Sequence, residues 1–425
     1  MIFPPGFTSP GEIFGLCSRK KACKIEKKGD ESMQTLIELY DERPLENVLG
    51  VEVFHPERVV YVCPDDIGSL KRIQPKLRAY FRHRGLEPEI VIVKTEFFES
   101  AAMLEVFREI VKQYPDCAID ITGGTDAALF AAGLLCAETD IPVVTYSRRK
   151  NCFYSIRGTA FEGEMPCEVR YTVEDFFLMA GGSMREGRVD NSVLERYLKD
   201  INAFFALYLS HRRGWTNTVT YMQRVSPAAP DGSYSLNVHG AYEVKGERGS
   251  RITAPLEALR SMEKIGFLQD LVIVPEKSVS FRFRDKQIRA WLRDVGSVLE
   301  LYVYKACLDT GLFGDVRTSA IVDWEGDVSD KAVSNELDVM CTRGVTPVFI
   351  SCKTCDVKTE ALNELAILRD RFGGKMARAA IVTAERGGIA MRNRASELGI
   401  MVIDLDDLAR GRIKSRLKTL MRDIK

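Results

Sequence analysis

Residues 117–138 read Cys-Ala-Ile-Asp-Ile-Thr-Gly-Gly-Thr-Asp-Ala-Ala-Leu-Phe-Ala-Ala-Gly-Leu-Leu-Cys-Ala-Glu. The apolar run at 117–122 predicts a buried strand, and Gly123 and Gly124 predict a tight turn after it. The stretch 125–138 has the length and composition of a helix. A strand that passes through a short turn into a helix is the building unit of α/β proteins.

The same order of apolar run and helical stretch repeats on both sides of this unit. Further strands are predicted at 34–40, 58–63, 89–93 and 141–146. Helical stretches are predicted at 44–50, 66–84 and 99–113. Strands that are apolar almost throughout, with amphipathic helices between them, indicate a parallel sheet covered on both faces. We therefore expect a Rossmann-like α/β domain over 33–178, with strand-like 151–157 and 167–172 adding an antiparallel hairpin at its edge.

The segments that flank this domain differ from it in composition. Residues 1–32 are rich in Gly, Pro, Lys and Glu and have no clear period, which predicts a disordered extension. Residues 179–285 are predicted to form a small α+β region, with elements in the order helix 190–210, polar stretch 225–252, helix 254–264 and strand pair 269–284. This order fits a winged-helix-like module, and a plain linker domain is the alternative.

A new α/β unit is predicted over 286–425. It begins with a long amphipathic helix at 288–310 and continues with five strands and three further helices. Its strands are predicted at 316–323, 335–342, 347–353, 377–383 and 400–404, and its other helices at 357–372, 387–397 and the basic C-terminal end. This element order indicates a compact domain with a mixed sheet.

The composition limits the class of protein. The chain has 425 residues, with Lys+Arg and Asp+Glu both at 60 and 45% hydrophobic residues, as in soluble globular proteins. No apolar run approaches the roughly 20 residues that cross a bilayer. The first residues lack a secretory signal, so we expect no membrane contact and a cytoplasmic location. Cys352 and Cys355 form a CxxC without the second pair that a zinc site requires.

Two predicted strands of the C-terminal unit carry the residues with the clearest chemistry. Glu336 and Asp338 are two residues apart and therefore point to one face of their strand, as do Ser351 and Lys353 on the next strand. A hairpin would bring two carboxylates, a hydroxyl and an ammonium together. Magnesium or manganese prefers such oxygen ligands, and a lysine can orient a water for phosphodiester cleavage. A surface ion pair between Asp338 and Lys353 is the alternative.

Glu300, on the preceding helix, is a further candidate acid. Val295, Leu299 and Val303 form an apolar stripe beside it, so this edge of the helix is expected to face the core. An ordinary solvated glutamate is the alternative interpretation.

A second candidate site lies in the N-terminal domain. Thr122, Gly123, Gly124 and Thr125 connect a strand to a helix, where glycines allow a ligand to approach the backbone and free N–H groups can bind phosphate. Plain turn chemistry is the alternative. The pattern matches neither the dinucleotide fingerprint GxGxxG nor the P-loop GxxxxGK[ST].

Two more loops are expected at the same carboxyl edge of the sheet, where open α/β sheets bind ligands. Asp41, Glu42 and Asn47 follow the first strand. Ser147 and Arg148 follow the last main strand and place a cation where it can face phosphates. An exposed basic turn is the alternative for Arg148.

The arrangement of Asp338, Ser351 and Lys353, with Glu300 upstream, resembles the PD-(D/E)xK superfamily of restriction-like nucleases. From Met33 onward the chain resembles the CARF-domain nucleases that accompany type III CRISPR systems. The motifs that carry this resemblance are Asp-Glu-x-Pro-x-Glu-Asn-Val at 41–48, Thr-Gly-Gly-Thr at 122–125, Asn-Glu-Leu-Asp at 335–338 and Ser-Cys-Lys at 351–353.

The resemblance implies a sensor of cyclic oligoadenylate, with cyclic tetra-adenylate as the activating ligand, joined to a restriction-endonuclease-like domain that needs Mn²⁺ or Mg²⁺. It implies a homodimer that cuts single-stranded DNA or RNA, or nicks duplex DNA, in antiviral defence. Ser351 departs from the superfamily pattern, which has an acid at this position. Asp338, Glu300 and Glu336 are then left as the metal ligands.

Two other functions stay open at this stage. A ligand-responsive DNA-binding regulator with a catalytically degenerate nuclease domain is compatible with Ser351. An ordinary nucleotide-binding enzyme on a Rossmann-like fold is the third possibility, and the lack of both phosphate fingerprints counts against it.

Overall fold

The computed structural model describes residues 33–65, 70–96, 98–159, 161–187, 189–228, 232–246, 249–323 and 334–422. The predicted disordered extension at 1–32 lies outside the described residues.

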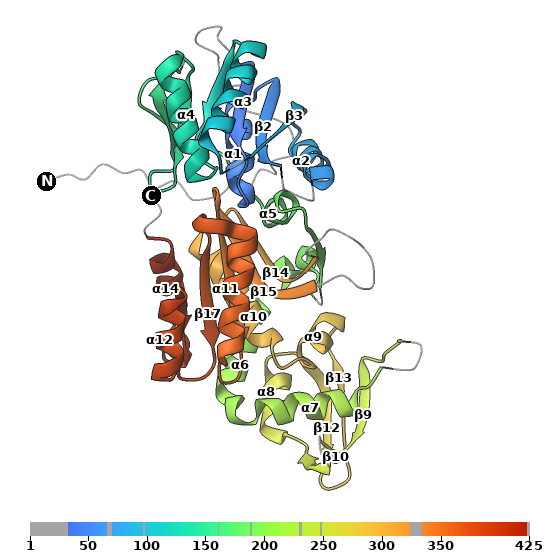
Figure 1. Cartoon of the computed structure of the whole chain (residues 1–425). Helices are drawn as coiled ribbons and strands as arrows, with labels where there is room; N and C mark the ends of the chain where they lie inside the picture. The colour runs from blue at the N-terminus through green and yellow to red at the C-terminus, as the bar shows by residue number, and fades with distance from the viewer. Residues whose placement is uncertain are drawn as a thin grey trace, which may run out of the picture. The chain divides into compact units, whose positions relative to one another are not determined.

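The first sheet has seven strands in the order β3-β2-β1-β4-β5-β6-β7 (Figure 1). Its strands are β1 (Thr35–Leu39), β2 (Arg58–Pro64), β3 (Glu89–Thr95), β4 (Cys117–Asp120), β5 (Val143–Ser147), β6 (Cys152–Arg157) and β7 (Glu164–Pro166). The first five strands pair in parallel and the last two antiparallel. This topology confirms the predicted Rossmann-like fold class.

Helices cover both faces of this sheet. They are η1 (Pro44–Asn47), α1 (Leu49–Phe54), α2 (Leu70–His83), α3 (Ser100–Gln113) and α4 (Asp126–Glu138). In β1, Leu36 packs in the cluster that contains α1 and α2, whereas its neighbour Ile37 packs with α3 and α4. Because successive side chains of a strand point to opposite faces, a strand buried on both faces is apolar throughout.

The predicted second strand of the edge hairpin, at 167–172, is wrong. The strand that pairs with β6 is β7, and residues 167–172 leave the sheet. The N–H of Tyr171 donates to the carbonyl of Gly344 (3.1 Å), far along the chain. This backbone group therefore bonds to the C-terminal part of the protein instead of a neighbouring strand.

The middle region contains more helix than the sequence predicts. The first predicted domain ends with α5 (Val173–Met179). The elements of the middle region are β8 (Ser183–Glu186), η2 (Asn191–Tyr197), α6 (Leu198–His211), η3 (Arg212–Gly214), α7 (Trp215–Val225), β9 (Asn237–Ala241), β10 (Glu243–Lys245), β11 (Arg251–Thr253), α8 (Leu256–Lys264), β12 (Leu268–Val274) and β13 (Ser278–Phe283). The predicted helix at 190–210 begins as a 3-10 turn, and α7 was not predicted. The described elements include helix α8 followed by a hairpin, in a sheet with the strand order β12-β13-β9. Whether this region is a winged-helix-like module or a plain linker domain stays a prediction.

The second large sheet has six strands in the order β18-β17-β16-β15-β14-β8. Its strands from the C-terminal part are β14 (Asp315–Asp323), β15 (Ser334–Arg343), β16 (Thr346–Lys353), β17 (Arg378–Thr383) and β18 (Ile400–Ile403). Its helices are α9 (Lys286–Trp291), α10 (Ser297–Thr310), α11 (Thr359–Gly373), η5 (Gly374–Met376), α12 (Ile389–Glu397), α13 (Leu405–Ala409) and α14 (Ile413–Leu420). The mixed sheet agrees with the predicted fold class.

The predicted single helix at 288–310 is divided into α9 and α10. The carboxylate of Asp294 accepts hydrogen bonds from the N–H of Gly296 (3.1 Å) and from Ser297 Oγ (2.9 Å). These bonds fold the intervening segment into a turn, which is the usual effect of an aspartate on nearby backbone groups.

The middle region contributes to this second sheet as well. Strand β8 pairs antiparallel with β14, and one buried cluster extends from Val189 to Met421. The predicted domain limits near 178 and 285 therefore stay predictions. Among the described residues, no helix is long and apolar enough to span a bilayer.

Candidate functional site

Asp338, Ser351 and Lys353 come together where β15 and β16 separate. The last paired residues of this ladder are Val339 and Ile350. Beyond them, the N–H of Cys352 donates to Asp338 Oδ2 (2.6 Å), and Ser351 Oγ donates to the same oxygen (3.0 Å). Lys353 Nζ lies 3.6 Å from Asp338 Oδ2. A side-chain carboxylate thus takes the place that a strand carbonyl has in the regular ladder.

The surroundings of Asp338 act on its charge in opposite directions. Burial raises the pKa of its carboxyl, while Lys353 and the hydrogen bonds from Cys352 and Ser351 oppose that rise in part. The side chain of Asp338 is 16% exposed and that of Lys353 is 38% exposed. The two groups therefore form a partly exposed ion pair, which a phosphate or a cation can reach.

A hollow of about 60 Å³ lies beside this pair. It is lined by Glu336, Leu337, Asp338, Ile350, Ser351 and Lys353 from the strands and by Ala361, Glu364, Leu365 and Leu368 from α11. Helix α11 packs against β16 and β17 (Figure 1). Sequence reasoning missed Glu364, because the pattern of a helix does not tell which strand residues the helix will contact.

The other two predicted acids lie differently. Glu336 lines the hollow, and its Oε1 accepts a hydrogen bond from Ser319 Oγ (2.9 Å). Glu300 does not line the hollow: it belongs to α10, and its charge acts on the thiol of Cys352, whose pKa is raised by burial and by Asp338 and Glu300. Side chains of β16 alternate between the two faces, so Cys352 and Ser351 point to opposite sides.

The donors around the hollow fit the chemistry of a hard divalent cation. Glu336, Asp338 and Glu364 supply carboxylate oxygens and Ser351 a hydroxyl, which are the ligands that Mg²⁺ and Mn²⁺ prefer. In the described parts of the chain, no three His, Cys, Asp or Glu side chains are already gathered closely enough to hold a metal.

In the first sheet, the loop after β1 is closed by its own side chains. The N–H of Asp41 donates to Asn47 Oδ1 (2.8 Å), and Asn47 Nδ2 donates to the carbonyl of Asp41 (2.7 Å). Arg43 donates to the carboxylate of Asp41 through its backbone N–H (2.9 Å) and its Nε (2.7 Å). Burial opposes the charge of Asp41, but the bonds from Arg43 and from the backbone of Gly124 lower its pKa. Glu42 is exposed in the same loop.

The Gly-Gly turn after β4 packs directly on this first loop. A Cβ added to Gly123 would lie 2.9 Å from the carbonyl oxygen of Leu39 and 3.1 Å from Cβ of Asp41. Gly124 has φ +91, a conformation that L side chains rarely adopt. Both glycines are therefore required for the close approach of the two loops, which is a packing role that does not depend on a ligand.

The threonines on either side of the glycines have separate tasks. Thr122 Oγ1 donates to Asp120 Oδ1 and accepts from the N–H of Tyr146 (2.8 Å). Thr125 is the N-cap of α4, and its hydroxyl accepts from the N–H of Ala128 (3.3 Å). Thr122 thus joins β4 to the end of β5.

The third predicted loop is tied to the first by charge. Arg148 makes an ion pair with Glu46 Oε1, and Glu46 is buried at 3% exposure. Burial raises the pKa of Glu46, although Arg148 and Arg43 oppose that rise. Ser147 is the last residue of β5. The structure therefore gathers all three predicted loops at the carboxyl edge of the first sheet.

Beneath these loops lies a pair of buried acids. Glu38 and Asp120 are register partners on β1 and β4, exposed by 0% and 1%. Burial raises the pKa of Glu38 well above its usual value, and Asp120 raises it further. Burial also raises the pKa of Asp120 to about 7, against the bonds from Thr122. Among the described residues, neither oxygen of Glu38 has a hydrogen-bond partner.

Comparison with known proteins bears on the C-terminal part of the chain first. Residues 286–424 match the family model described as the Card1-like endonuclease domain. The hollow between β15, β16 and α11 lies within it.

Solved structures resemble the chain over most of its length. Protein VC1899 from Vibrio cholerae superposes with a TM-score of 0.71 at 16% identity, covering 92% of this chain and 99% of that one. Can2 from Sulfobacillus thermosulfidooxidans, solved in complex with cyclic tetra-adenylate, gives 0.66 at 16% identity, covering 92% of this chain and 97% of its own. A search of curated proteins found no match.

These likenesses show the fold of most of the chain, since identities of 16% carry no more than that. They confirm the predicted α/β fold class, and the family match at 286–424 agrees with the nuclease part of the predicted family.

Proposed function

We propose that the chain is a metal-dependent nuclease that cyclic tetra-adenylate activates in type III CRISPR defence. The observation that carries this proposal is the Asp338–Lys353 pair beside a hollow lined by further carboxylates, inside a Card1-like endonuclease domain. A structural ion pair on a sheet surface does not need such a hollow.

The residues of the hollow divide the chemistry of phosphodiester cleavage among them. Asp338 would hold Mg²⁺ or Mn²⁺ together with Glu336 and Glu364. When bound, the metal supplies charge that polarises the phosphate and acidifies a water. Lys353 places an ammonium where a phosphate oxygen gains negative charge, and Ser351 keeps the carboxylate of Asp338 in position.

Glu300 has a smaller part in this proposal than the sequence predicts. It does not line the hollow, and Glu364 from α11 occupies the opposite wall from Asp338. Glu364 Oε1 accepts a hydrogen bond from Asn335 Nδ2 (2.7 Å), which directs its carboxylate toward β15. An acid from α11 can thereby replace the acid that the superfamily pattern expects at Ser351.

The activator is proposed to bind at the carboxyl edge of the first sheet. Support comes from the three loops that the structure gathers there, carrying Asp41, Glu42 and Asn47, then Thr122–Thr125, then Ser147 and Arg148. Arg148 has its partner Glu46 nearby and can exchange it for a phosphate. The likeness to Can2, which was solved with cyclic tetra-adenylate, supports the same ligand class.

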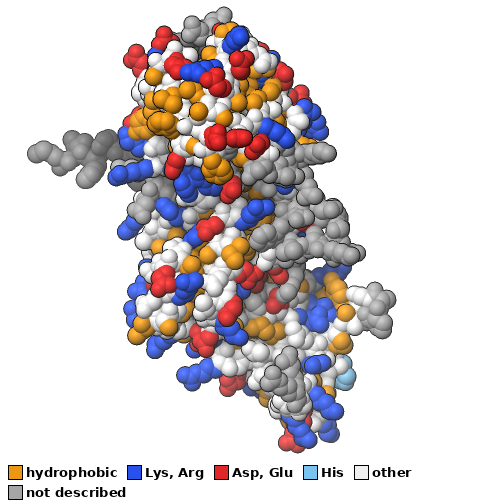
Figure 2. All heavy atoms as spheres, viewed as in Figure 1, with side chains coloured by type: hydrophobic (Ala, Val, Ile, Leu, Met, Phe, Trp, Pro, Cys, Tyr) orange, Lys and Arg blue, Asp and Glu red, His pale blue; other side chains and the backbone are white. Residues whose placement is uncertain are grey.

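A homodimer is also proposed. Helix α4, which begins directly after the Gly-Gly turn, exposes Leu129 (38%), Phe130 (61%) and Leu134 (37%). Hydrophobic side chains gather over this helix in Figure 2. Contiguous exposed apolar surface of this kind marks an interface, and a second copy packed on α4 would bring two sets of ligand loops together.

The test is cleavage of labelled single-stranded DNA, RNA and plasmid with Mn²⁺, with and without cyclic tetra-adenylate. We expect cleavage only when ligand and metal are both present, and loss of cleavage in Asp338→Ala and Lys353→Ala. Which nucleic acid is cut identifies the substrate. Cleavage that persists in both variants would place the active site elsewhere.

A ligand-responsive DNA-binding regulator is the second candidate. Ser351 in place of an acid and the helix-plus-hairpin order of α8, β12 and β13 favour it. Tight ligand binding without cleavage of any substrate, together with ligand-dependent retention of duplex DNA, would support the regulator over the nuclease.

A further inference from the structure

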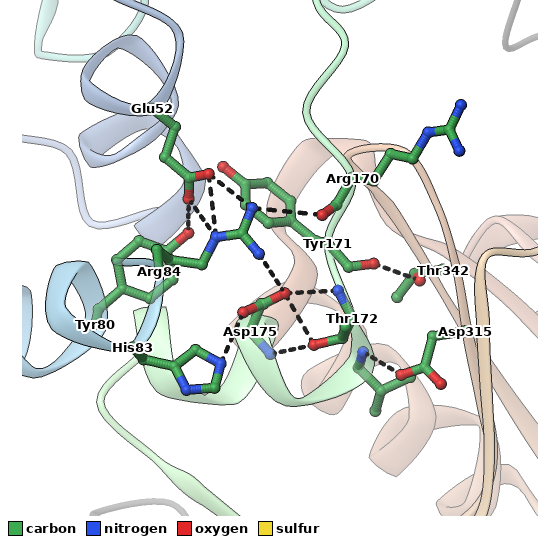
Figure 3. Close-up of polar contacts among 11 residues, drawn as sticks. Glu52, Tyr80, His83, Arg84, Arg170, Tyr171, Thr172, Asp175, Asp315 and Thr342 are labelled. Atoms are coloured by element: carbon green, nitrogen blue, oxygen red, sulfur yellow. Dashed lines mark hydrogen bonds and ion pairs between the residues drawn. The ribbon is translucent and has the colours of Figure 1, made fainter. Parts of the chain in front are cut away.

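One arginine contacts carboxylates from two parts of the chain at once. Arg84 follows α2, and its guanidinium binds Glu52 of α1 through Nη2 (2.8 Å to Oε2) and Nε (3.1 Å to both oxygens). Its Nη1 donates to Asp175 Oδ2 of α5 (3.2 Å). Figure 3 shows the planar side chain lying between the two carboxylates. An arginine is suited to this because its donors form a rigid fork.

Both carboxylates are withdrawn from solvent. Glu52 is 7% exposed and Asp175 is 0% exposed. Burial opposes the charge of Arg84, but Glu52 and Asp175 outweigh it and raise the pKa of the guanidinium. Tyr80 donates its hydroxyl to Glu52, and His83 Nε2 lies 3.2 Å from Asp175 Oδ1. Removing Arg84 would leave buried negative charge without its main partner, which is costly.

Asp175 fixes the start of α5. Its Oδ2 accepts from the N–H (2.6 Å) and the hydroxyl (2.8 Å) of Thr172, whose hydroxyl accepts from the N–H of Asp175 (3.3 Å). This is a capping box. In the same turn, the N–H of Val173 donates to Asp315 Oδ2 at the start of β14 (2.9 Å).

Tyr171, the residue before the N-cap Thr172, is hydrogen-bonded to β15. Thr342 Oγ1 donates to the carbonyl of Tyr171 (2.6 Å). Thr342 and Asp338 are on the same strand, four residues apart, so the cap of α5 is tied to the strand that carries the carboxylate of the nuclease site. Figure 3 shows these contacts continuing from Arg84 through Asp175 to Asp315 and Thr342.

On the other side, Glu52 is close in sequence to the ligand loops. It lies on α1, which starts two residues after Asn47. The hydroxyl of Tyr61 donates to the carbonyl of Asn47 (2.6 Å), so the first loop and α1 are held as one piece on the sheet. Glu52 is therefore connected to the loop at 41–47 through α1.

We infer that Arg84 and Asp175 connect the two large sheets, so that a ligand bound at the first sheet controls the sheet that carries Asp338 and Lys353. The inference rests on the proposed function and assigns its regulation to two positioning residues. Displacement of Glu52 moves Arg84, Arg84 moves the cap of α5, and the cap moves the ends of β14 and β15. Coupling between two binding sites is typically worth about 5-fold to 150-fold in affinity and is reciprocal.

The experiment compares Arg84→Met with Arg58→Met. Arg58 binds Glu89 of β3 (2.8 Å) and lies over the ring of Tyr114 (4.5 Å), the residue that ends α3. It has the same kinds of contact as Arg84 without the link to Asp175. In each protein the dissociation constant of cyclic tetra-adenylate is measured with and without a non-cleavable single strand, alongside cleavage with and without ligand.

In the wild type and Arg58→Met, we expect nucleic acid to tighten ligand binding at least about 5-fold and ligand to stimulate cleavage. In Arg84→Met we expect the ligand still to bind. The ratio of its dissociation constants without and with nucleic acid, and the ratio of cleavage with and without ligand, both fall to near one. Asp175→Asn, which keeps a capping oxygen and removes the charge, should do the same, and thermal unfolding shows whether each variant is folded.

Full reciprocal coupling in folded Arg84→Met and Asp175→Asn would overturn the inference while leaving the proposed function intact. A wild-type protein that binds no cyclic tetra-adenylate would instead overturn the proposed function, and the inference with it.

Discussion

Asp120 in the first sheet and Asp338 in the second are both aspartates whose pKa is raised by burial. Asp120 is 1% exposed and faces another acid, Glu38, under the ligand loops. Asp338 borders a hollow and faces the ammonium of Lys353. The carboxylate of Asp120 is thus enclosed beside another acid, whereas that of Asp338 is partly exposed beside a cation.

This difference separates a structural acid from a reactive one. A sealed carboxylate beside another acid is most stable when it is protonated, and it then acts as a neutral hydrogen-bonding group inside the sheet. A partly exposed carboxylate beside an ammonium has a partner that favours its charged form and can bind a cation. The following predictions test whether the two sites differ in this way.

The largest effect is expected from Asp338→Asn. This change keeps the shape of the side chain but removes the charge that would hold the metal, whose effect on the barrier is several kcal/mol. We expect cleavage to fall roughly 10³-fold, with Mn²⁺ binding weakened in calorimetry. Asp370→Asn, an exposed acid on α11, is the control and should leave both unchanged. Unaltered Mn²⁺ binding in Asp338→Asn would remove the distinction between the two aspartates.

The next effect concerns the pH dependence of stability. The folded-state pKa of Asp120 is about 7, above its usual 3.8. Its contribution to stability is therefore complete below about pH 3.8 and is lost as the pH rises through about 7. Glu38 acts with the same sign. We expect the free energy of unfolding of the wild type to fall by a few kcal/mol between these two pH values. In Asp120→Asn the free energy of unfolding should depend less on pH. Urea unfolding at successive pH values measures both.

Asp120→Asn keeps the oxygen that accepts from Thr122, so a folded variant is expected. If its stability still falls between pH 4 and 7 as steeply as that of the wild type, Asp120 is not the buried proton-binding group.

A substitution at Gly50 tests how tightly Glu38 and Asp120 are enclosed. A Cβ at this position would lie 2.5 Å from Asp120 Oδ2 and 2.7 Å from Glu38 Oε1. Gly50→Ala should therefore cost about 1–3 kcal/mol of unfolding free energy through overpacking. Gly314→Ala, where an added Cβ meets nothing within 4 Å, is the control. Equal stability of the two variants would show that the pair is less tightly enclosed.

The smallest effect is expected at Ser351. Ser351→Ala removes one of the donors to Asp338 Oδ2 and leaves the N–H of Cys352 in place. A net loss of about 1 kcal/mol corresponds to roughly fivefold to tenfold slower cleavage. Ser415→Ala on α14 serves as the control. A loss as large as that of Asp338→Asn would make Ser351 a direct ligand of the metal and not a support for Asp338.

Local pattern was sufficient for most elements of the chain. Apolar runs predicted β1 to β5 and the order of strands and helices after residue 286, because backbone geometry turns the spacing of apolar residues directly into faces. The same spacing placed Ser351 and Lys353 on one side of β16. Where a polar side chain could bond to nearby backbone, as Asp294 does between α9 and α10, the pattern failed to show the break.

Other features could not be read from spacing because their partners are distant in the chain. Glu364 reaches the wall opposite Asp338 only because α11 packs across β16, and Glu300 belongs to the helix on the other side. Segment 167–172 looked like a strand, yet Tyr171 bonds to Gly344.

The sequence alone therefore determined the two α/β units, the family resemblance and the residues that carry charge at the two sites. The tertiary structure decided which of those charges meet: Glu38 with Asp120, Asp338 with Lys353, and Arg84 with Asp175. The reason is physical, since the periodicity of a segment reports only which face is buried, whereas pairing and burial of charges depend on how distant segments pack.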